Sequence, residues 1–282
     1  MRFRGNLTAP AFPILMEVSQ YMNRITNADS CFVMVTPERI SFILKTSGED
    51  IQTFVHLAMA KLFTDVVLES RSDNNIAFTL SIENFTRALQ SGKEASGILL
   101  RLLKRDGRSF LSMRARTVDI DIIQNIPIEV LSVASVENHK EPAIPSPNVA
   151  LEIPSLKSLR TVTDRLKAMQ KFLTIEANMD GSIRLRVKSD TFALQTQHVG
   201  FKPRFDLIQA DGEDENTENE PALKTSTVCV DGRHFAKMLS VDGNAVVTIL
   251  CCLIDNRALV LHTILCEGFG SFTCYSPVIA HE

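Results

Sequence analysis

The first part of the chain combines short strand-like runs with one helical run. Alternating apolar and polar positions, or short apolar runs between turn residues, are typical of strands. The sequence therefore predicts strands over residues 2–7, 31–35, 40–44 and 76–80 and a helix over residues 10–25. Apolar residues three or four positions apart share one face of a helix and indicate its side toward the core. In this helix they are Leu15, Val18, Met22 and Ile25.

The second part of the chain repeats that order. It predicts strands over residues 149–153, 172–177 and 183–187, a helix over residues 155–171, and a turn at Asp180 and Gly181. The expected apolar face of this helix consists of Leu156, Leu159, Val162, Leu166 and Met169. Because short helices do not alternate one for one with strands, the pattern favours an antiparallel α+β fold over a parallel doubly wound sheet.

A second repeated motif indicates a duplicated domain. Residues 84–89 and 234–239 share an order of apolar and basic positions and begin 150 positions apart. Each copy follows a strand candidate, at residues 76–80 or 228–230, and precedes two long apolar strands. We therefore predict two topologically similar domains.

Three prolines mark the connection between these domains. Pro142, Pro145 and Pro147 keep the chain extended and cannot continue a helix or a central strand. The sequence thus predicts an N-terminal domain over residues 1–131, a linker over 132–148 and a C-terminal domain over 149–282.

Composition places the chain among globular proteins. Of 282 residues, 45% are hydrophobic and 22% are charged, which disfavours a disordered or collagen-like chain. No apolar run approaches the roughly 20 residues of a membrane helix, and the first residues lack a signal peptide, so we expect a soluble, intracellular protein without membrane partners. The six cysteines contain no C-x-x-C pair and are expected to be reduced core residues.

The charge distribution qualifies the net charge of −3. Residues 211–220 contain six acids and no base, as expected of a solvated, mobile loop, and without these acids the second half carries +3. In the 155–171 helix, basic residues recur on the face opposite its leucines, where they could contact DNA phosphates without reading bases or could simply be a solvated surface. The candidate DNA-facing residues are Arg24, Arg87, Lys93, Lys157, Arg160, Lys167, Lys171, Arg233 and Lys237.

Catalytic motifs are missing from the sequence. It contains no nucleophile elbow, H-E-x-x-H, P-loop or dinucleotide-binding motif. Asp119 and Asp121, predicted on one strand face, could hold a metal but are expected to be solvated, and His262 with Cys266 indicates a strand edge more than a metal site. We expect a non-enzymatic protein without cofactor or metal, and a hydrolase is the disfavoured alternative.

Several segments resemble the Hus-type subunit of the nine-one-one DNA-damage checkpoint clamp. They are residues 1–4, 126–130, 141–145, 156–159 and 175–181, and the resemblance extends over essentially the whole chain, least closely at 197–224. It implies a sliding-clamp fold like that of the proliferating-cell nuclear antigen, with three subunits per ring, helices lining the channel and antiparallel sheets outside. It also implies two related partner subunits of the Rad nine and Rad one types, sequence-independent binding of double-stranded DNA, a clamp loader, checkpoint and repair clients, and a location in the nucleus with a cytoplasmic pool.

The resemblance also implies two strands that join neighbouring subunits, at about residues 118–131 and 191–198, although both could be ordinary internal strands. The candidate interface residues are Asp119, Ile120, Ile122, Ile128, Phe192, Leu194 and Thr196. The linker would flank an apolar pocket for client peptides. Two alternatives of the same architecture are a homotrimeric replication processivity clamp and a scaffold that binds only proteins.

Overall fold

The computed structural model of the chain describes residues 1–25, 30–45, 50–132, 134–135, 139–208, 224–241 and 243–279. The predicted acidic loop at 211–220 lies outside these residues. In the N-terminal half the elements are β1 (Arg2–Leu7), α1 (Ala11–Ile25), β2 (Cys31–Val35), β3 (Arg39–Leu44), β4 (Gln52–Ala58), α2 (Met59–Leu62), β5 (Phe63–Glu69), β6 (Ile76–Leu80), α3 (Ile82–Ser91), β7 (Gly97–Arg105), β8 (Arg108–Arg116) and β9 (Asp121–Leu131).

The C-terminal half begins again with a strand followed by a helix. Its elements are β10 (Val149–Glu152), α5 (Lys157–Met169), β11 (Phe172–Asn178), β12 (Ser182–Lys188), β13 (Ala193–His198), β14 (Lys202–Pro203), η1 (Phe205–Leu207), β15 (Thr225–Asp231), α6 (Gly232–Met238), β16 (Val246–Ile254), β17 (Ala258–Leu265), η2 (Cys266–Gly268) and β18 (Gly270–Pro277).

Strand pairing repeats between the halves. β1 pairs with β5 and β7, as β10 pairs with β14 and β16. β2 pairs with β3 and β6, as β11 pairs with β12 and β15, and the β7–β8–β9 meander corresponds to β16–β17–β18. All these pairs are antiparallel, as the sequence predicted. β9 ends at Leu131 and β10 begins at Val149, and we propose that the residues between them form the linker of the two domains.

One strand pair joins the two halves into a continuous sheet. Gly270–Tyr275 of β18 pairs with residues 52–57 of β4, which creates the fourteen-stranded order β14-β10-β16-β17-β18-β4-β3-β2-β6-β9-β8-β7-β1-β5. The strands equivalent to β4 and β18 are β13 and β9. β13 is an edge of the second sheet, β13-β12-β11-β15, and β9 contacts β6 only from Ile128 onward. Among the described residues, the first part of β9 therefore has an open edge on that side.

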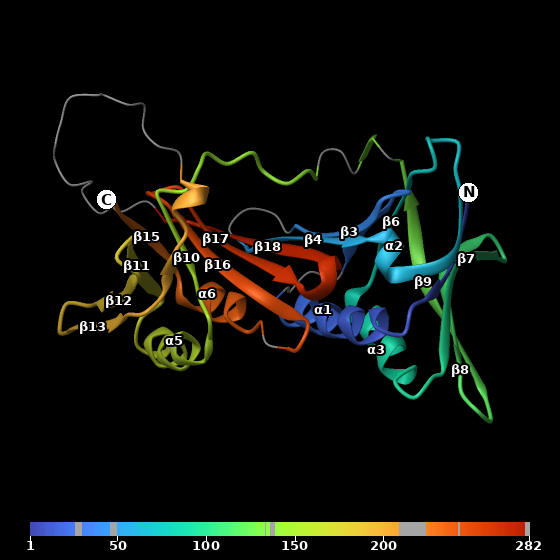
Figure 1. Cartoon of the computed structure of the whole chain (residues 1–282), viewed down its shortest axis with the longest axis horizontal. Coiled ribbons are helices and arrows are strands. Elements are labelled where there is room, and N and C mark those ends of the chain that lie inside the picture. The colour runs from blue at the N-terminus through green and yellow to red at the C-terminus, as the bar shows by residue number, and fades with distance from the viewer. Residues whose placement is uncertain are drawn as a thin grey trace.

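Helices α1, α3, α5 and α6 lie along one side of the strands (Figure 1). α5 contacts α6, α6 contacts α1, and α1 contacts α3. We call these four helices the helix layer. Tyr21 of α1 crosses between the halves, because its buried hydroxyl donates to the Met238 carbonyl of α6 at 2.9 Å and its ring lies 4.7 Å from that of Phe272 on β18. The helix layer and the sheet thus share one core.

The structure corrects four expectations about individual residues. Met169 is 57% exposed in the last turn of α5, and the buried face of this helix is completed by Thr163 instead. Asp119 and Ile120 precede β9 in a turn that the Thr117 N–H closes by donating to the Ile120 carbonyl at 3.0 Å. Phe192 likewise precedes β13, in a turn closed by the Ser189 N–H at 2.8 Å from its carbonyl.

The cysteines follow the prediction of a reduced core. All six are free, and five of them are buried, while Cys266 is half-buried. Burial raises the pKa of Cys31 to about 12 and that of Cys274 to about 11. These thiols therefore stay protonated at neutral pH and are poor nucleophiles.

The linker is anchored on the outer face of the central sheet by Glu141. The Tyr275 hydroxyl of β18 donates to its Oε1 at 2.7 Å, and His56 Nε2 of β4 lies 3.5 Å from Oε2. His56 Nδ1 is in turn 2.9 Å from the Ser41 hydroxyl of β3. The hydrogen bond from His56, then that from Tyr275, holds the pKa of Glu141 below its ordinary value although partial burial opposes the shift. One carboxylate thus ties the linker to strands of both halves.

We predict that Glu141→Gln releases this part of the linker. A lowered pKa in the folded protein means that the docking energy is fully present above the ordinary glutamate pKa of about 4.3 and is lost as the pH falls through the lowered value. Trypsin should cleave the variant faster after Lys140 at neutral pH. Glu94→Gln, a control at an exposed residue, should leave the rate of cleavage after Lys140 unchanged. If NMR shows that the Glu141 carboxyl titrates in the ordinary range of a free glutamate, the proposed anchor is contradicted.

Candidate nucleic-acid interface

Helix α5 has a narrow buried face, which leaves most of its circumference free for basic residues. Leu159, Thr163 and Leu166 are buried at spacings of four and three. Lys157 at the start of the helix and Lys171 just after its end are exposed.

Two of the predicted cations on α5 are less exposed to solvent than the sequence suggested. At 100° per residue, Arg160 and Lys167 fall beside the buried face, and both are half-buried. Lys167 is paired with Asp164 one turn earlier, so part of its charge is compensated. Arg165 points to the exposed side and was missed as a candidate, although its angular position along the predicted helix could have identified it.

Helix α6 packs closely against the end of α5. A Cβ on Gly232 would lie 3.2 Å from the Lys167 Cβ, and the Gly232 N–H donates to the Lys171 carbonyl at 2.9 Å. The Asp231 carboxylate caps the helix by accepting the Arg233 N–H at 2.7 Å. Arg233 is exposed and Lys237 is half-buried, so α6 extends the basic surface of α5.

Helices α1 and α3 contribute less positive charge. Arg24 is exposed at the end of α1, and its Nε donates to the Gln20 carbonyl at 3.4 Å. Arg87 of α3 pairs with Glu83 one turn earlier, and Lys93 is exposed beyond the helix. Glu17 of α1 accepts the backbone N–H of Ala245 at 3.0 Å, which ties this acid to the loop before β16.

The helix layer is positive although the chain is negative. Its helices contain eight lysines and arginines and three acidic residues, a net charge of +5 against −3 for the whole chain. α5 and α6 supply six of the bases and one of the acids, whereas α1 and α3 supply two of each. A polyanion lying along this layer would therefore be held mainly by the C-terminal half.

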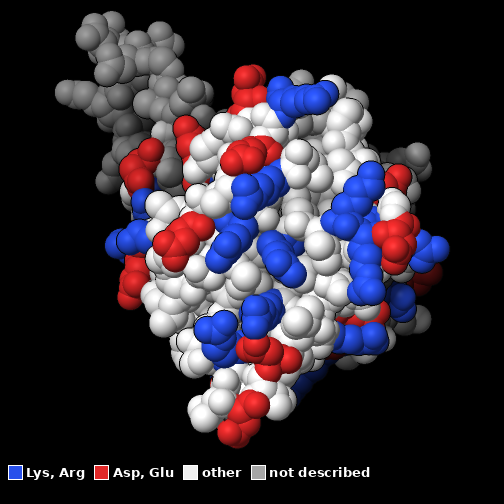
Figure 2. Space-filling model, turned by 90° about the vertical axis from the view of Figure 1, so that its right-hand side faces the viewer, with Lys and Arg blue, Asp and Glu red and all other residues white. Residues whose placement is uncertain are grey.

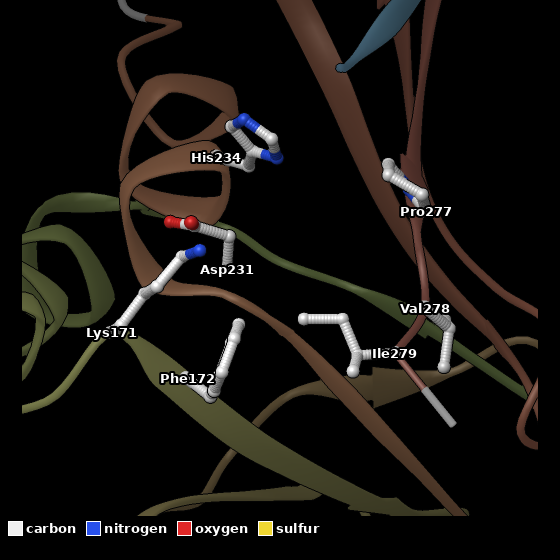
Figure 3. A pocket seen from close by; sticks show the side chains of 7 residues that line it. All are labelled: Lys171, Phe172, Asp231, His234, Pro277, Val278 and Ile279. Atoms are coloured by element: carbon white, nitrogen blue, oxygen red, sulfur yellow. The ribbon is translucent and has the colours of Figure 1, made fainter. Parts of the chain in front are cut away.

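A cavity of about 360 Å³ opens beside this layer, where β11 and α6 begin (Figure 3). Phe172 and Ile279 face each other across it, and Asp231 and His234 lie toward α6. The polar groups already have structural partners, since Asp231 caps α6 and His234 Nε2 lies 3.2 Å from Asp50. The lining offers no pair of groups arranged for acid–base or nucleophilic chemistry.

Metal and membrane features are also missing from the described part of the chain. No three His, Cys, Asp or Glu residues come together in a metal-binding group there. His262 Nδ1 is 3.0 Å from the Thr273 hydroxyl. None of the helices in the described residues is long and apolar enough to cross a membrane.

Comparison with known proteins identifies relatives over the full length of the chain. Residues 1–279 match the sequence profile of the family described as Hus1-like protein. The chain is 29% identical to a checkpoint protein hus1 homolog of Dictyostelium discoideum, with 99% of each chain covered. It is 28% identical to checkpoint protein hus1 of Schizosaccharomyces pombe, with 84% of this chain and 85% of the relative covered, and 24% identical to human checkpoint protein HUS1, with 99% and 100% covered.

Solved structures show the same fold at low sequence identity. PCNA from Thermococcus kodakaraensis superposes with a TM-score of 0.70 at 12% identity, covering 98% of this chain and all of that one. Proliferating cellular nuclear antigen from Entamoeba histolytica gives 0.70 at 10% identity, with 99% of each chain covered. The expected sliding-clamp fold is thereby confirmed.

Proposed function

This chain belongs to the Hus1-like family, and on that premise we propose that it is a non-enzymatic subunit of a checkpoint sliding clamp that encircles double-stranded DNA. The helix layer is the observation that supports this most directly. It places a net charge of +5 on one side of a negative chain, on adjacent helices backed by a sheet. The phosphate backbone is the sequence-independent partner for such a surface.

Encirclement does not require tight contacts. A closed ring keeps DNA at high effective concentration, so a few screened ion pairs per subunit position the duplex and still let it slide. The Debye length is about 8 Å at physiological salt, so local helix charges act on nearby phosphates more strongly than distant acids do. The net negative charge of the chain is therefore compatible with DNA binding.

The strand pairing supports a way to close the ring. Within the chain, β4 and β18 join the two halves, and their equivalents β13 and β9 have open edges. Repeating the β4–β18 junction between chains would pair β9 of one subunit with the β13 equivalent of the next. An unpaired edge otherwise invites unwanted association.

Exposed apolar side chains lie on these edges. Ile123 of β9 is 57% exposed and Leu194 of β13 is 39% exposed. Burying them against neighbouring subunits would add hydrophobic stabilisation to the backbone hydrogen bonds. Of the predicted interface residues, Ile122, Ile128, Leu194 and Thr196 lie within these strands, while Asp119, Ile120 and Phe192 lie in the preceding turns.

We propose that the neighbours are two related clamp subunits, of the Rad nine and Rad one types. A clamp loader would place the ring on DNA in the nucleus, and checkpoint factors and repair enzymes would use it there. This part of the proposal is supported by the checkpoint names of the relatives.

Native mass spectrometry of the chain co-expressed with both partner types tests this assembly. We expect one complex with a single copy of each of three subunits, and no closed ring from the chain alone. A stable ring of three identical copies would contradict the proposal and support the homotrimeric processivity clamp.

A further inference from the structure

Four arginines gather on the outer face of the β1–β7–β8 sheet, away from the helix layer. They are Arg4, Arg101, Arg114 and Arg116, which we call the outer arginine patch. Figure 2 views this end of the molecule and shows several basic side chains close together. All four patch residues are exposed, while their strand neighbours Phe3, Leu100 and Met113 are buried on the opposite face.

The strand register places two of these charges directly against each other. Arg4 of β1 pairs with Arg101 of β7, and like charges opposite one another in an antiparallel pair are destabilising. Arg114 is diagonal to Arg101, because Arg101 pairs with Ser112. Neither Arg4 nor Arg101 has an ion pair with any residue that the structure describes. The free protein therefore carries a repulsion that a bound anion would relieve.

The other half of the patch already binds a carboxylate. Asp121 at the start of β9 accepts from Arg114 Nε at 3.1 Å and lies 3.6 Å from Arg116 Nε. The hydrogen bond from Arg114 keeps the pKa of Asp121 below its ordinary value. With Asp121 included, the patch still has a charge of +3, concentrated toward Arg4 and Arg101.

A cavity of about 340 Å³ lies between the arginines. Arg4, Arg114 and Arg116 line it together with Leu7 and Leu99, which are half-buried. Arginine forks bind carboxylate or phosphate oxygens in a bidentate way, and the leucines offer an apolar surface between them. This combination suits a peptide with an apolar residue between acidic ones better than a nucleic-acid backbone, whose phosphates carry no apolar group.

We propose that the outer arginine patch is a docking surface for an acidic peptide segment of a partner protein, with carboxylate or phosphoserine oxygens on Arg4 and Arg101 and an apolar side chain in the cavity. The surface faces away from the helix layer, so such a partner and DNA could bind together. The proposal does not require ring assembly and can be tested on the full chain alone.

Fluorescence anisotropy tests it with a labelled peptide that repeats the unit Glu-Leu-Glu-Ser. We expect binding at physiological salt, no binding of the Gln-Leu-Gln-Ser counterpart, and a loss of about tenfold or more in affinity for Arg4→Glu with Arg101→Glu. Lys104→Glu with Arg108→Glu makes the same charge change at the β7–β8 hairpin end, outside the patch, and should alter affinity much less. Equal losses of peptide affinity in both double variants would mean that only general charge attraction is at work, and this would overturn the proposal.

Two further variants keep the result interpretable if charge reversal disturbs folding. Arg4→Lys with Arg101→Lys keeps the charge but removes the fork, so a clear loss of affinity is expected, and unchanged binding would contradict bidentate recognition. Asp121→Asn removes the competing carboxylate and should tighten peptide binding, whereas unchanged or weaker binding would exclude Arg114 and Arg116 from the site. A labelled single-stranded DNA of equal charge that binds as tightly, and depends on Arg4 and Arg101, would identify a nucleic-acid surface instead.

Discussion

A clamp whose α5 cations are replaced by glutamate should lose most of its salt-dependent hold on DNA. The replacements are Lys157→Glu, Arg160→Glu, Lys167→Glu and Lys171→Glu. Three of these residues lie within α5, so the net charge of the helix layer changes from +5 to −1. The layer then repels phosphates instead of attracting them. The logarithm of the binding constant decreases with the logarithm of the salt concentration. This negative slope should become shallower by about 0.9 for every phosphate that the layer no longer neutralises.

The measurement is retention of the assembled clamp on DNA over a series of salt concentrations. Arg24→Glu with Arg87→Glu is a comparison in the N-terminal half with half the charge change, and it leaves the layer positive at +1. We expect a smaller loss from this pair, because Arg87 is already paired with Glu83. Unchanged retention and slope in the α5 variant would favour a scaffold that binds only proteins.

The second large effect concerns the two open strand edges. Ile123→Glu should separate the chain from one neighbour and Leu194→Glu from the other, so each variant is expected to keep one partner and lose the other. Burying an unpaired carboxylate in a subunit interface costs several kcal/mol, which exceeds what one apolar contact contributes. The double variant should be recovered as an isolated, folded chain.

Co-purification with the two partner subunits measures this effect. Val66→Glu on β5 is the matched control, because Val66 has the same 39% exposure as Leu194 and lies on neither of these two edges. Loss of the same partner in both single variants, or a complete ring in the double variant, would refute the proposed junctions.

Local patterns were sufficient to predict most elements of the fold. β2 and β6 match their predicted ranges because each is a short apolar run. α1 differs from its predicted range by one residue, because its apolar residues keep the helical period. The errors fall at element ends, where hydrogen bonds of the adjoining turns determine which residue begins the strand. Asp119 and Phe192 continue an alternating pattern, but the turns closed by Thr117 and Ser189 exclude them from the strands.

The sequence could predict the surroundings of some basic residues better than those of others. Periodicity placed Lys157 correctly on an exposed side, since it requires only the helix geometry. Lys171 is also exposed, but it lies beyond the end of α5, where the helix period no longer applies. Periodicity could not show that Lys167 would be paired with Asp164. The outer arginine patch depends on the register between β1, β7 and β8, which joins residues nearly a hundred positions apart along the chain. A single sequence does not fix such a long-range register.

The junction between β4 and β18 has a mechanical consequence for how a ring of such chains could open. Backbone hydrogen bonds cross it along residues 52–57, and the Tyr21 bond to Met238 and the Glu141 anchor reinforce it on opposite sides of the sheet. Each chain should then behave as a stiff arc, without a hinge at its middle. Admission of a duplex would strain the seams between chains first, and the gate of the ring would be one of those seams.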